Sequence, residues 1–377
     1  MGATLSQVAA EAGVSLMTAS RAVRGVGRVK AETRERVLDA VQRLGGMPND
    51  GMVMSRLLHN NAADSRLRVI LPQFTSLGQQ SRSLMSCHFK QGVEKRIAER
   101  GGCLYVADVE SCDEVLDTMD KQRLNAVILR TAVPREWVDR LAERGPVVYA
   151  VAHDFQSNVD TVHANEHRSA ALIVDYLAGR GHHNVVWFGI VDIHRHKLMR
   201  AMASSTTCID RQGDSIHTVR HSAWANFAHC QVGSHGHSLI LAKRDWNYQT
   251  LEDTVEEGLQ QILSLRPQPT AVVVAAPKTA SVMVKALQKR GIEVPRDMSV
   301  IGYGVAADHA KQHPRPTLID VPMERIGHVV PELIERRLAN PDALAVSLSI
   351  DTSLSIGDTT GPAPSVSDAA KTLAASL

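Results

Sequence analysis

The sequence has 377 residues, 44% of them hydrophobic and 22% charged, with a formal net charge of +2. This length is enough for two or three domains, and no apolar run is long enough to span a bilayer. Five cysteines without paired spacing, and a start without a basic and apolar secretion signal, predict a cytoplasmic protein with reduced thiols and exclude disulfide-built secreted classes.

Basic residues are concentrated near the start of the chain. Residues 1–60 contain eight Lys or Arg and five Asp or Glu, an excess of +3 against +2 for the whole chain. A small basic segment of this kind favours a polyanionic partner.

Three short helices are predicted within residues 1–45. Thr4 is a candidate N-cap of the first, and Gly13 permits a tight turn after it. Ser15 is placed to cap the second helix, and the third begins near Ala31. The inner face of the second helix is apolar, with Ala19, Ala22 and Val23, and its opposite face carries Met17, Ser20, Arg21 and Arg24.

From residue 66 onward, short β-rich runs alternate with helical stretches. This alternation predicts parallel sheets covered by helices on both faces, and about 300 residues favour two lobes over one sheet. The predicted strands are Leu67–Leu71, Cys103–Ala107, Ala126–Leu129, Val147–Val151, Val185–Phe188, Ser238–Leu241, Ala271–Ala275 and Ser299–Tyr303. The predicted helices include Arg168–Gly179, Thr254–Ser264 and Ala280–Lys289.

The first two predicted helices, joined by a glycine turn, have the pattern of a helix-turn-helix. In that motif the second helix has a polar outer face and fits the major groove of DNA. Arg21 can donate two hydrogen bonds to guanine, and Leu16 and Met17 can contact a thymine methyl group. The candidates for phosphate contacts are Thr4, Ser15, Thr18 and Ser20. On the pattern alone, an ordinary solvated three-helix domain is an equal alternative.

The string from Thr4 to Val23, TLSQVAAEAGVSLMTASRAV, closely resembles the start of the lactose/galactose repressor family. The run Glu32–Leu38 resembles its third helix, and Pro48-Asn49 resembles the start of its hinge. The resemblance implies a dimeric regulator of palindromic operators, a repressor by family habit, in which Leu16, Met17 and Arg21 read bases. Among subgroups, residues 17–21 with Arg24 look most like the gluconate-utilisation regulators.

The hinge departs from the family pattern. The family inserts a hinge leucine into the minor groove, but Ser55 stands at that position and Gly51 weakens a hinge helix. Leu57 is the alternative wedge candidate, and Asn49 is a further candidate for DNA contact. Packing of Leu57 against the larger domain is a nearly equal interpretation.

Four segments resemble the periplasmic-binding-protein-like domain of the same family: residues 181–185, 291–303, 316–318 and 323–327. In that domain a small-molecule effector lies between the lobes, at the carboxyl ends of the strands. The resemblance therefore implies that effector binding changes the lobe geometry and, through it, the affinity for DNA.

The expected pocket carboxylates are missing here. Pro277-Lys278 stands where the family commonly has Asn-Asp, Gly304 replaces an aspartate, and Ala164-Asn165 replaces Asp-Asn. A cation in a cleft favours an anionic ligand such as a sugar acid or sugar phosphate, although Lys278 could equally be solvated, or the pocket could bind no small molecule. By position alone, further wall candidates are Phe74, Arg130, Asn165, Arg195, Arg200 and Trp246, each of which could equally pack or lie at the surface.

We therefore expect a helix-turn-helix domain (1–48), a hinge (49–65), a two-lobed α/β domain of doubly wound parallel sheets (66–361) and a disordered tail (362–377). The function predicted is a homodimeric or tetrameric, cytoplasmic DNA-binding regulator of carbohydrate metabolism. We expect no membrane contact, cofactor, metal or catalytic activity. The alternative is a solute-binding protein of a sugar transport system, which shares the two-lobed fold without the DNA-binding head.

Overall fold

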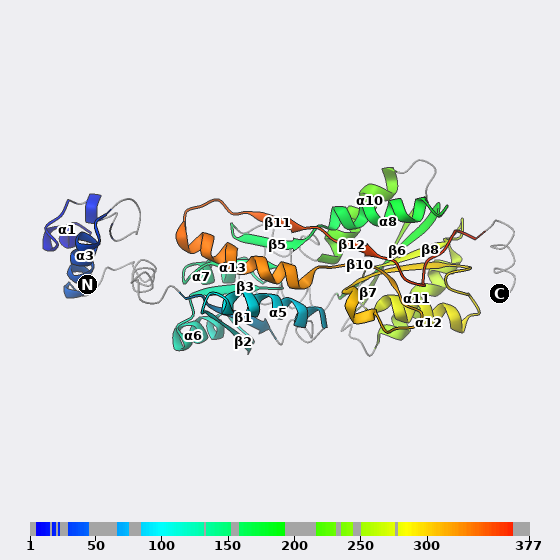
Figure 1. Ribbon diagram of the computed structural model, residues 1–377, viewed down its shortest axis with the longest axis horizontal. Helices are drawn as coiled ribbons and strands as arrows, with labels where there is room; N and C mark the ends of the chain where they lie inside the picture. Colours follow the sequence, from blue (N-terminus) through cyan, green and yellow to red (C-terminus); the bar gives the residue numbers. More distant parts are fainter. Residues whose placement is uncertain are drawn as a thin grey trace.

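The computed structural model describes residues 5–15, 17–19, 22, 29–44, 66–74, 84–131, 133–151, 158–192, 216–230, 235–243, 250–275 and 278–364. These residues form a small helical head and two α/β lobes (Figure 1). The head contains α1 (Leu5–Glu11) and α3 (Ala31–Arg43), with helical residues at 17–19 and 22 between them.

The predicted turn between the first two helices is confirmed. Gly13 has a positive φ of 62°, which suits glycine because it has no Cβ. The Ser15 hydroxyl accepts a hydrogen bond from the Thr18 backbone N–H at 3.1 Å, as expected of an N-cap. The head buries its own small apolar core, formed by Val8, Ala9, Ala12, Ala19, Ala22, Val37 and Ala40. Thr4, Val23 and the hinge lie outside the described residues.

Lobe 1 is built on a six-stranded parallel sheet of order β11-β5-β4-β3-β1-β2. Its strands are β1 (Arg68–Phe74), β2 (Cys103–Val109), β3 (Ala126–Leu129), β4 (Val147–Ala150), β5 (Asp160–Ala164) and β11 (Ser347–Ile350). Its helices are α5 (Leu84–Ala98), α6 (Cys112–Gln122), α7 (Arg135–Ala142) and α13 (Met323–Ala339).

Lobe 2 repeats the arrangement with the order β12-β10-β9-β8-β6-β7, in which β12 alone is antiparallel to its neighbour. Its strands are β6 (Asn184–Asp192), β7 (His235–Lys243), β8 (Ala271–Val274), β9 (Ser299–Gly304), β10 (Thr317–Asp320) and β12 (Ser353–Ser355). Its helices are α8 (Glu166–Ala178), α10 (Ile216–Cys230), α11 (Leu251–Ser264), α12 (Thr279–Lys289) and the short η4 (Ala306–His309).

Alternation of side chains along the strands gives each sheet two buried faces. In β3, Ala126 and Ile128 join the core beneath α5 and α13, while Val127 and Leu129 join the core beneath α6 and α7. In lobe 2, the two faces of β8 divide in the same way between the cores under α8 with α10 and under α11 with α12. The prediction of two doubly wound parallel sheets is confirmed.

All eight predicted strands are present, and four further strands were not predicted: β5, β10, β11 and β12. The first of these carries polar residues whose partners lie far along the chain. Asp160 in β5 is fully buried and bonds Arg337 at 2.8 Å, and the ring of His163 meets the Ser347 hydroxyl at 3.0 Å. Local periodicity cannot reveal a strand that is stabilised by such distant residues.

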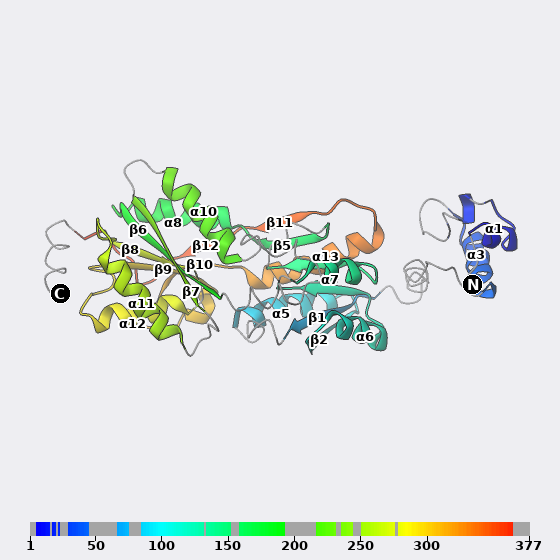
Figure 2. The ribbon, with the colours of Figure 1, turned by 180° about the vertical axis from the view of Figure 1, so that it is seen from behind.

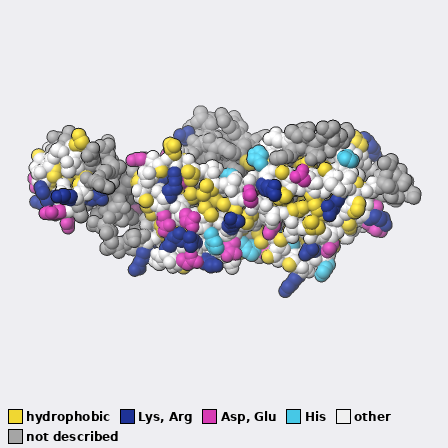
Figure 3. Space-filling view, turned by 45° about the horizontal axis from the view of Figure 1, so that its top comes forward, with side chains coloured by type: hydrophobic (Ala, Val, Ile, Leu, Met, Phe, Trp, Pro, Cys, Tyr) yellow, Lys and Arg dark blue, Asp and Glu magenta, His cyan; other side chains and the backbone are white. Residues whose placement is uncertain are grey.

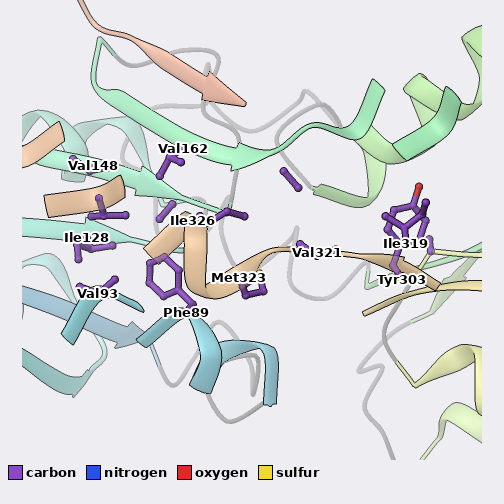
Figure 4. Packing of buried hydrophobic residues seen from close by; sticks show 14 of the residues in the cluster. Phe89, Val93, Ile128, Val148, Val162, Tyr303, Ile319, Val321, Met323 and Ile326 are labelled. Carbon is purple, nitrogen blue, oxygen red and sulfur yellow. The ribbon is translucent and has the colours of Figure 1, made fainter. Parts of the chain in front are cut away.

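The chain crosses between the lobes three times: from β5 to α8, from β10 to α13 and from β11 to β12 (Figures 1 and 2). One apolar cluster continues through the crossing at Val321 (Figure 4). Phe89 and Met323 lie on its lobe 1 side and Tyr303 on its lobe 2 side. The lobes are therefore joined by packed chain segments at this crossing.

Charges of both signs are intermingled over the face shown in Figure 3. Ion pairs also link α5 and α13, where Arg96 bonds Glu332 at 2.8 Å and Arg100 bonds Glu335 at 2.7 Å. Within the part of the chain that the structure describes, no helix has the length and apolar character needed to cross a bilayer.

Candidate functional site

The second helical segment of the head presents a mixed polar and apolar surface outward. Met17 is 62% exposed, whereas Ala19 and Ala22 are fully buried. Ser15 is exposed and Thr18 half-buried, and their hydroxyls are 2.8 Å apart. The sequence-predicted contacts outside the described residues are Thr4, Leu16, Ser20, Arg21, Arg24, Asn49 and Leu57.

The strand order of each lobe creates a crevice at its sheet. In lobe 2 the chain winds outward in opposite directions from the neighbours β6 and β8, so the crevice lies at the carboxyl ends of these strands. Ala275 directly follows β8 there, and its carbonyl accepts a hydrogen bond from Arg220 Nη1 at 3.1 Å. Ligands of doubly wound sheets bind at such positions.

Arg220 is held in a buried polar cluster. Its Nε donates to Glu166 Oε1 at 2.9 Å, and its guanidinium lies 4.3 Å from the centre of the Tyr303 ring. The Arg220 and Glu166 side chains are only 4% and 1% exposed. Glu166 begins α8, Arg220 lies on α10 and Tyr303 lies on β9, so three elements build the cluster.

Burial shapes the protonation of this cluster. It raises the pKa of Glu166 because a carboxylate loses hydration, and the charge of Arg220 offsets part of that rise. Burial also raises the pKa of the Tyr303 hydroxyl, which therefore stays protonated. Three of the buried oxygens that have no hydrogen-bond partner within the described residues belong to this part of lobe 2: Glu166 Oε2, the Tyr303 hydroxyl and Thr279 Oγ1. A polar ligand at this end of lobe 2 would satisfy them.

The corresponding crevice of lobe 1 lies between β1 and β3. Arg130 directly follows β3, and its Nη1 donates to the Ser86 hydroxyl at 2.5 Å. The guanidinium lies 4.7 Å from the centre of the Phe89 ring on the same helix. Burial lowers the pKa of Arg130 to about 10.

Asn165, predicted to bind effector, lies at the crossing from β5 to α8. Its side-chain oxygen accepts from the Arg168 backbone N–H at 3.0 Å and its side-chain nitrogen donates to Asp351 at 2.8 Å. The Asn165 backbone N–H donates to the Ile350 carbonyl at 2.8 Å. These bonds join two of the three crossings, so Asn165 helps to hold the connection between the lobes.

The other predicted wall residues are dispersed. Phe74 is 4% exposed and its ring lies 5.5 Å from that of Trp137, on the α7 side of the sheet. Lys278 is exposed, with a positive φ of 65°, directly before α12. Arg195, Arg200 and Trp246 lie outside the described residues.

The lobes also touch through a polar pair away from the crossings. His88 on α5 and Asp308 on η4 approach to 2.8 Å and are both partly buried. This contact bridges the first part of α5 in lobe 1 and the segment after β9 in lobe 2. A movement of one lobe against the other would have to change it.

Sequence reasoning missed Glu166 and Arg220 because they are 54 residues apart and match no local motif. A usable signal was present: Arg220 stands on a helix composed otherwise of small, apolar and neutral polar residues, with histidines. A charge in such a setting predicts a buried partner. No group of three His, Cys, Asp or Glu in the described portion is arranged to hold a metal ion.

Comparison with known families matches both parts of the chain. Residues 4–49 match the bacterial regulatory proteins of the lacI family, and residues 174–360 match the periplasmic binding protein-like domain.

Characterised relatives match over most of their length. The catabolite control protein A of Priestia megaterium is 24% identical over 345 residues, covering 89% of this chain and 92% of that protein. The transcriptional regulator GntR of Pseudomonas aeruginosa is 25% identical over 349 residues, covering 90% of each. The second of these relatives is a helix-turn-helix transcriptional regulator by name.

Solved structures share the fold. The CelR–cellobiose complex superposes with a TM-score of 0.60 at 20% identity, covering 95% of this chain and 99% of that chain. The lac repressor dimer bound to operator and the anti-inducer ONPF gives 0.60 at 19%, covering 96% and 100%. With a helix-turn-helix head and a two-lobed domain matched together, the chain belongs to the lacI family and is a DNA-binding transcription regulator.

Proposed function

We propose that this protein represses transcription as a cytoplasmic homodimer, with an operator affinity that depends on a small molecule bound between its lobes. The observation that carries the DNA-reading part is the outward Met17 on a helix whose other face is buried. Such a helix can enter the major groove without exposing the apolar core of the head.

The proposed base readers are Leu16, Met17 and Arg21, with Arg24 on the same face. Phosphate contacts are proposed for Thr4, Ser15, Thr18 and Ser20, and the Ser15 hydroxyl supports this by its place at the start of the second helix. In the hinge, Asn49 and Leu57 are proposed to contact DNA, Leu57 as the minor-groove wedge.

A gel-shift assay on the upstream region of the protein's own gene tests this proposal. We expect Arg21→Ala to lower operator affinity by about 1–3 kcal/mol and to relax base preference at one position. Arg43→Ala is the matched control, because Arg43 is exposed on α3 and its loss removes the same charge. Unchanged binding of Arg21→Ala to a mapped operator would contradict the proposed orientation, and a chain that binds no DNA would fit a transport solute binder.

The effector is proposed to lie between the two lobes, at the crevices where their strands end, near Arg130 and the Arg220–Glu166 cluster. Two structural relatives were solved with cellobiose and with the anti-inducer ONPF, which supports a small-molecule effector for this chain. The unpartnered oxygens of lobe 2 support a ligand with several hydrogen-bonding groups. Phe74, Asn165, Arg195, Arg200, Trp246 and Lys278 stay proposals as effector contacts.

A further inference from the structure

The two lobes are structural repeats, but the arginines at their two crevices have different partners. In lobe 1 the order β1-α5-β2-α6-β3 matches β6-α10-β7-α11-β8 in lobe 2. Arg130 and Ala275 take the same place in this repeat, each being the residue after a four-residue strand. In lobe 2 the arginine at this place comes from α10 and is neutralised by Glu166.

Arg130 has no such carboxylate partner among the described residues. Its one hydrogen bond goes to the neutral hydroxyl of Ser86, and its Nε is buried without a partner. The ring of Phe89 covers one side of the guanidinium. Arg130 is partly buried, and a cation with a desolvated nitrogen and no counter-charge costs free energy, so its position favours an anion supplied from outside.

Two other enclosed arginines among the described residues have a carboxylate partner. Arg220 bonds Glu166 at 2.9 Å, and Arg337, 14% exposed, bonds the buried Asp160 at 2.8 Å. Both therefore have a carboxylate within hydrogen-bond distance. Arg34 and Arg68 resemble Arg130 in having a buried Nε without a partner, but only Arg130 of these three directly follows a strand at the place where a doubly wound sheet binds its ligand.

The surroundings of Arg130 also favour negative charge. Alternation along β3 directs Arg130 to the same face as Ala126 and Ile128, which is the face covered by α5. Ser86 is the third residue of α5, so the guanidinium lies beside the first turn of that helix, where the helix dipole favours an anion.

We propose that Arg130, Ser86 and the first turn of α5 form an anion subsite that binds a carboxylate or phosphate group of the effector. This inference rests on the proposed function and narrows it to an acidic, hydroxyl-bearing molecule. The effector spans the cleft, with its charged group on lobe 1 and its hydroxyl groups at Glu166 and Tyr303 of lobe 2. Glu166 accepts hydrogen bonds there and repels a second anionic group, which fixes the orientation of the molecule.

Isothermal titration calorimetry of the full chain without DNA tests the subsite. Sodium phosphate and sodium acetate are titrated separately at constant ionic strength in chloride, so that the two arms distinguish the two anionic groups. We expect saturable one-site binding of at least one anion to the unsubstituted protein, and a dissociation constant at least tenfold higher in Arg130→Gln. Arg325→Gln is the control, because Arg325 is exposed on α13 and its substitution removes the same charge.

The subsite is overturned if neither anion binds saturably, or if Arg130→Gln binds it as the unsubstituted protein does. Circular dichroism is used to check that Arg130→Gln is folded. If it is unfolded, Arg130→Lys is measured instead, and because it keeps the charge it is expected to retain part of the affinity. Operator binding is measured separately. Anion binding by a chain that binds no DNA would keep the subsite and reject the regulator proposal.

Discussion

Glu166 and Arg220 hold each other in a part of lobe 2 where both side chains are almost fully buried. Removing one member of such a pair leaves the other charge without compensation, which costs more than the pair itself contributes. The pair also neutralises an arginine that would otherwise attract anions to lobe 2. Loss of the pair is therefore expected to change ligand binding as well as stability.

Glu166→Gln tests this double effect. We expect it to lower the free energy of unfolding by about 3 kcal/mol and to create a second anion site at the released Arg220. Urea unfolding measures the first change, and phosphate calorimetry measures the second as a stoichiometry rising from one to two. A stoichiometry that stays at one would show that Arg220 is not available to ligands.

His182 connects three segments of lobe 2 through its ring. Its Nδ1 lies 2.9 Å from the Thr270 hydroxyl, and its Nε2 lies 3.0 Å from the Gly361 carbonyl and 3.1 Å from the Ser299 hydroxyl. Burial lowers the pKa of His182 below its ordinary value of 6.5. The folded state therefore binds fewer protons than the unfolded state just below pH 6.5, and stability is lost as the pH falls through that range.

We expect His182→Gln to lower the free energy of unfolding by about 1–3 kcal/mol at pH 7.5, because it leaves buried polar partners unsatisfied. Its unfolding midpoint should also fall less steeply than that of the unsubstituted protein between pH 7 and pH 5. Thermal unfolding followed by circular dichroism measures both. The exposed neighbour His183 gives the control His183→Gln, and equal pH slopes in all three proteins would contradict the assignment.

At the scale of elements, α5 and α13 cross at two glycines. A Cβ on Gly92 would lie 2.1 Å from the Glu324 carbonyl oxygen, and one on Gly327 would lie 2.3 Å from that of Phe89. Both distances are shorter than any real carbon contact to a backbone atom, so the helices touch only because these side chains are absent. The crossing seats α13, which returns from lobe 2, on the lobe 1 sheet.

Gly327→Ala is expected to lower the free energy of unfolding by about 1–3 kcal/mol, because overpacking outweighs the helix propensity of about 1 kcal/mol that alanine adds. Chemical denaturation measures it. Arg325→Ala on the exposed side of the same helix should leave stability nearly unchanged. A Gly327→Ala protein that is more stable than its parent would show that the helices separate easily.

The sequence predicted elements well where one strand or helix carries its own signal. The strand Ala126–Leu129 is a buried apolar run that can be recognised locally, and Ser15 is a cap that bonds a residue three positions on. The strand Asp160–Ala164 was missed because Asp160 depends on Arg337, 177 residues away. The candidate effector site was partly predicted. Arg130 was named from its position after a strand, but only the folded structure shows that its Nε is buried without a partner.

At the scale of the whole molecule, the proposed dimer needs a surface on the two-lobed domain. The edge strand β2 pairs on one side only, with β1. Tyr105 and Val106 are consecutive on it and each 38% exposed, so both faces of the edge are partly open. An open apolar edge favours association with a second chain.

We expect Val106→Lys to shift the protein from dimer toward monomer, because a charge would have to be buried at the contact. Size-exclusion chromatography with light scattering over a range of concentrations measures the shift. Leu344→Lys is the control, since Leu344 is 82% exposed away from this edge. A dimer that withstands Val106→Lys at every concentration would place the contact elsewhere.

The three crossings also have a consequence for synthesis on the ribosome. Lobe 1 contains α13 and β11, which are encoded after every strand of lobe 2 except β12. The first lobe thus cannot finish folding until about residue 350 has emerged, although its β1 is made near the beginning. A prematurely terminated chain would carry a DNA-binding head on an unfinished lobe with its β5 edge bare, a species suited to capture by chaperones and proteases rather than to competition for operators.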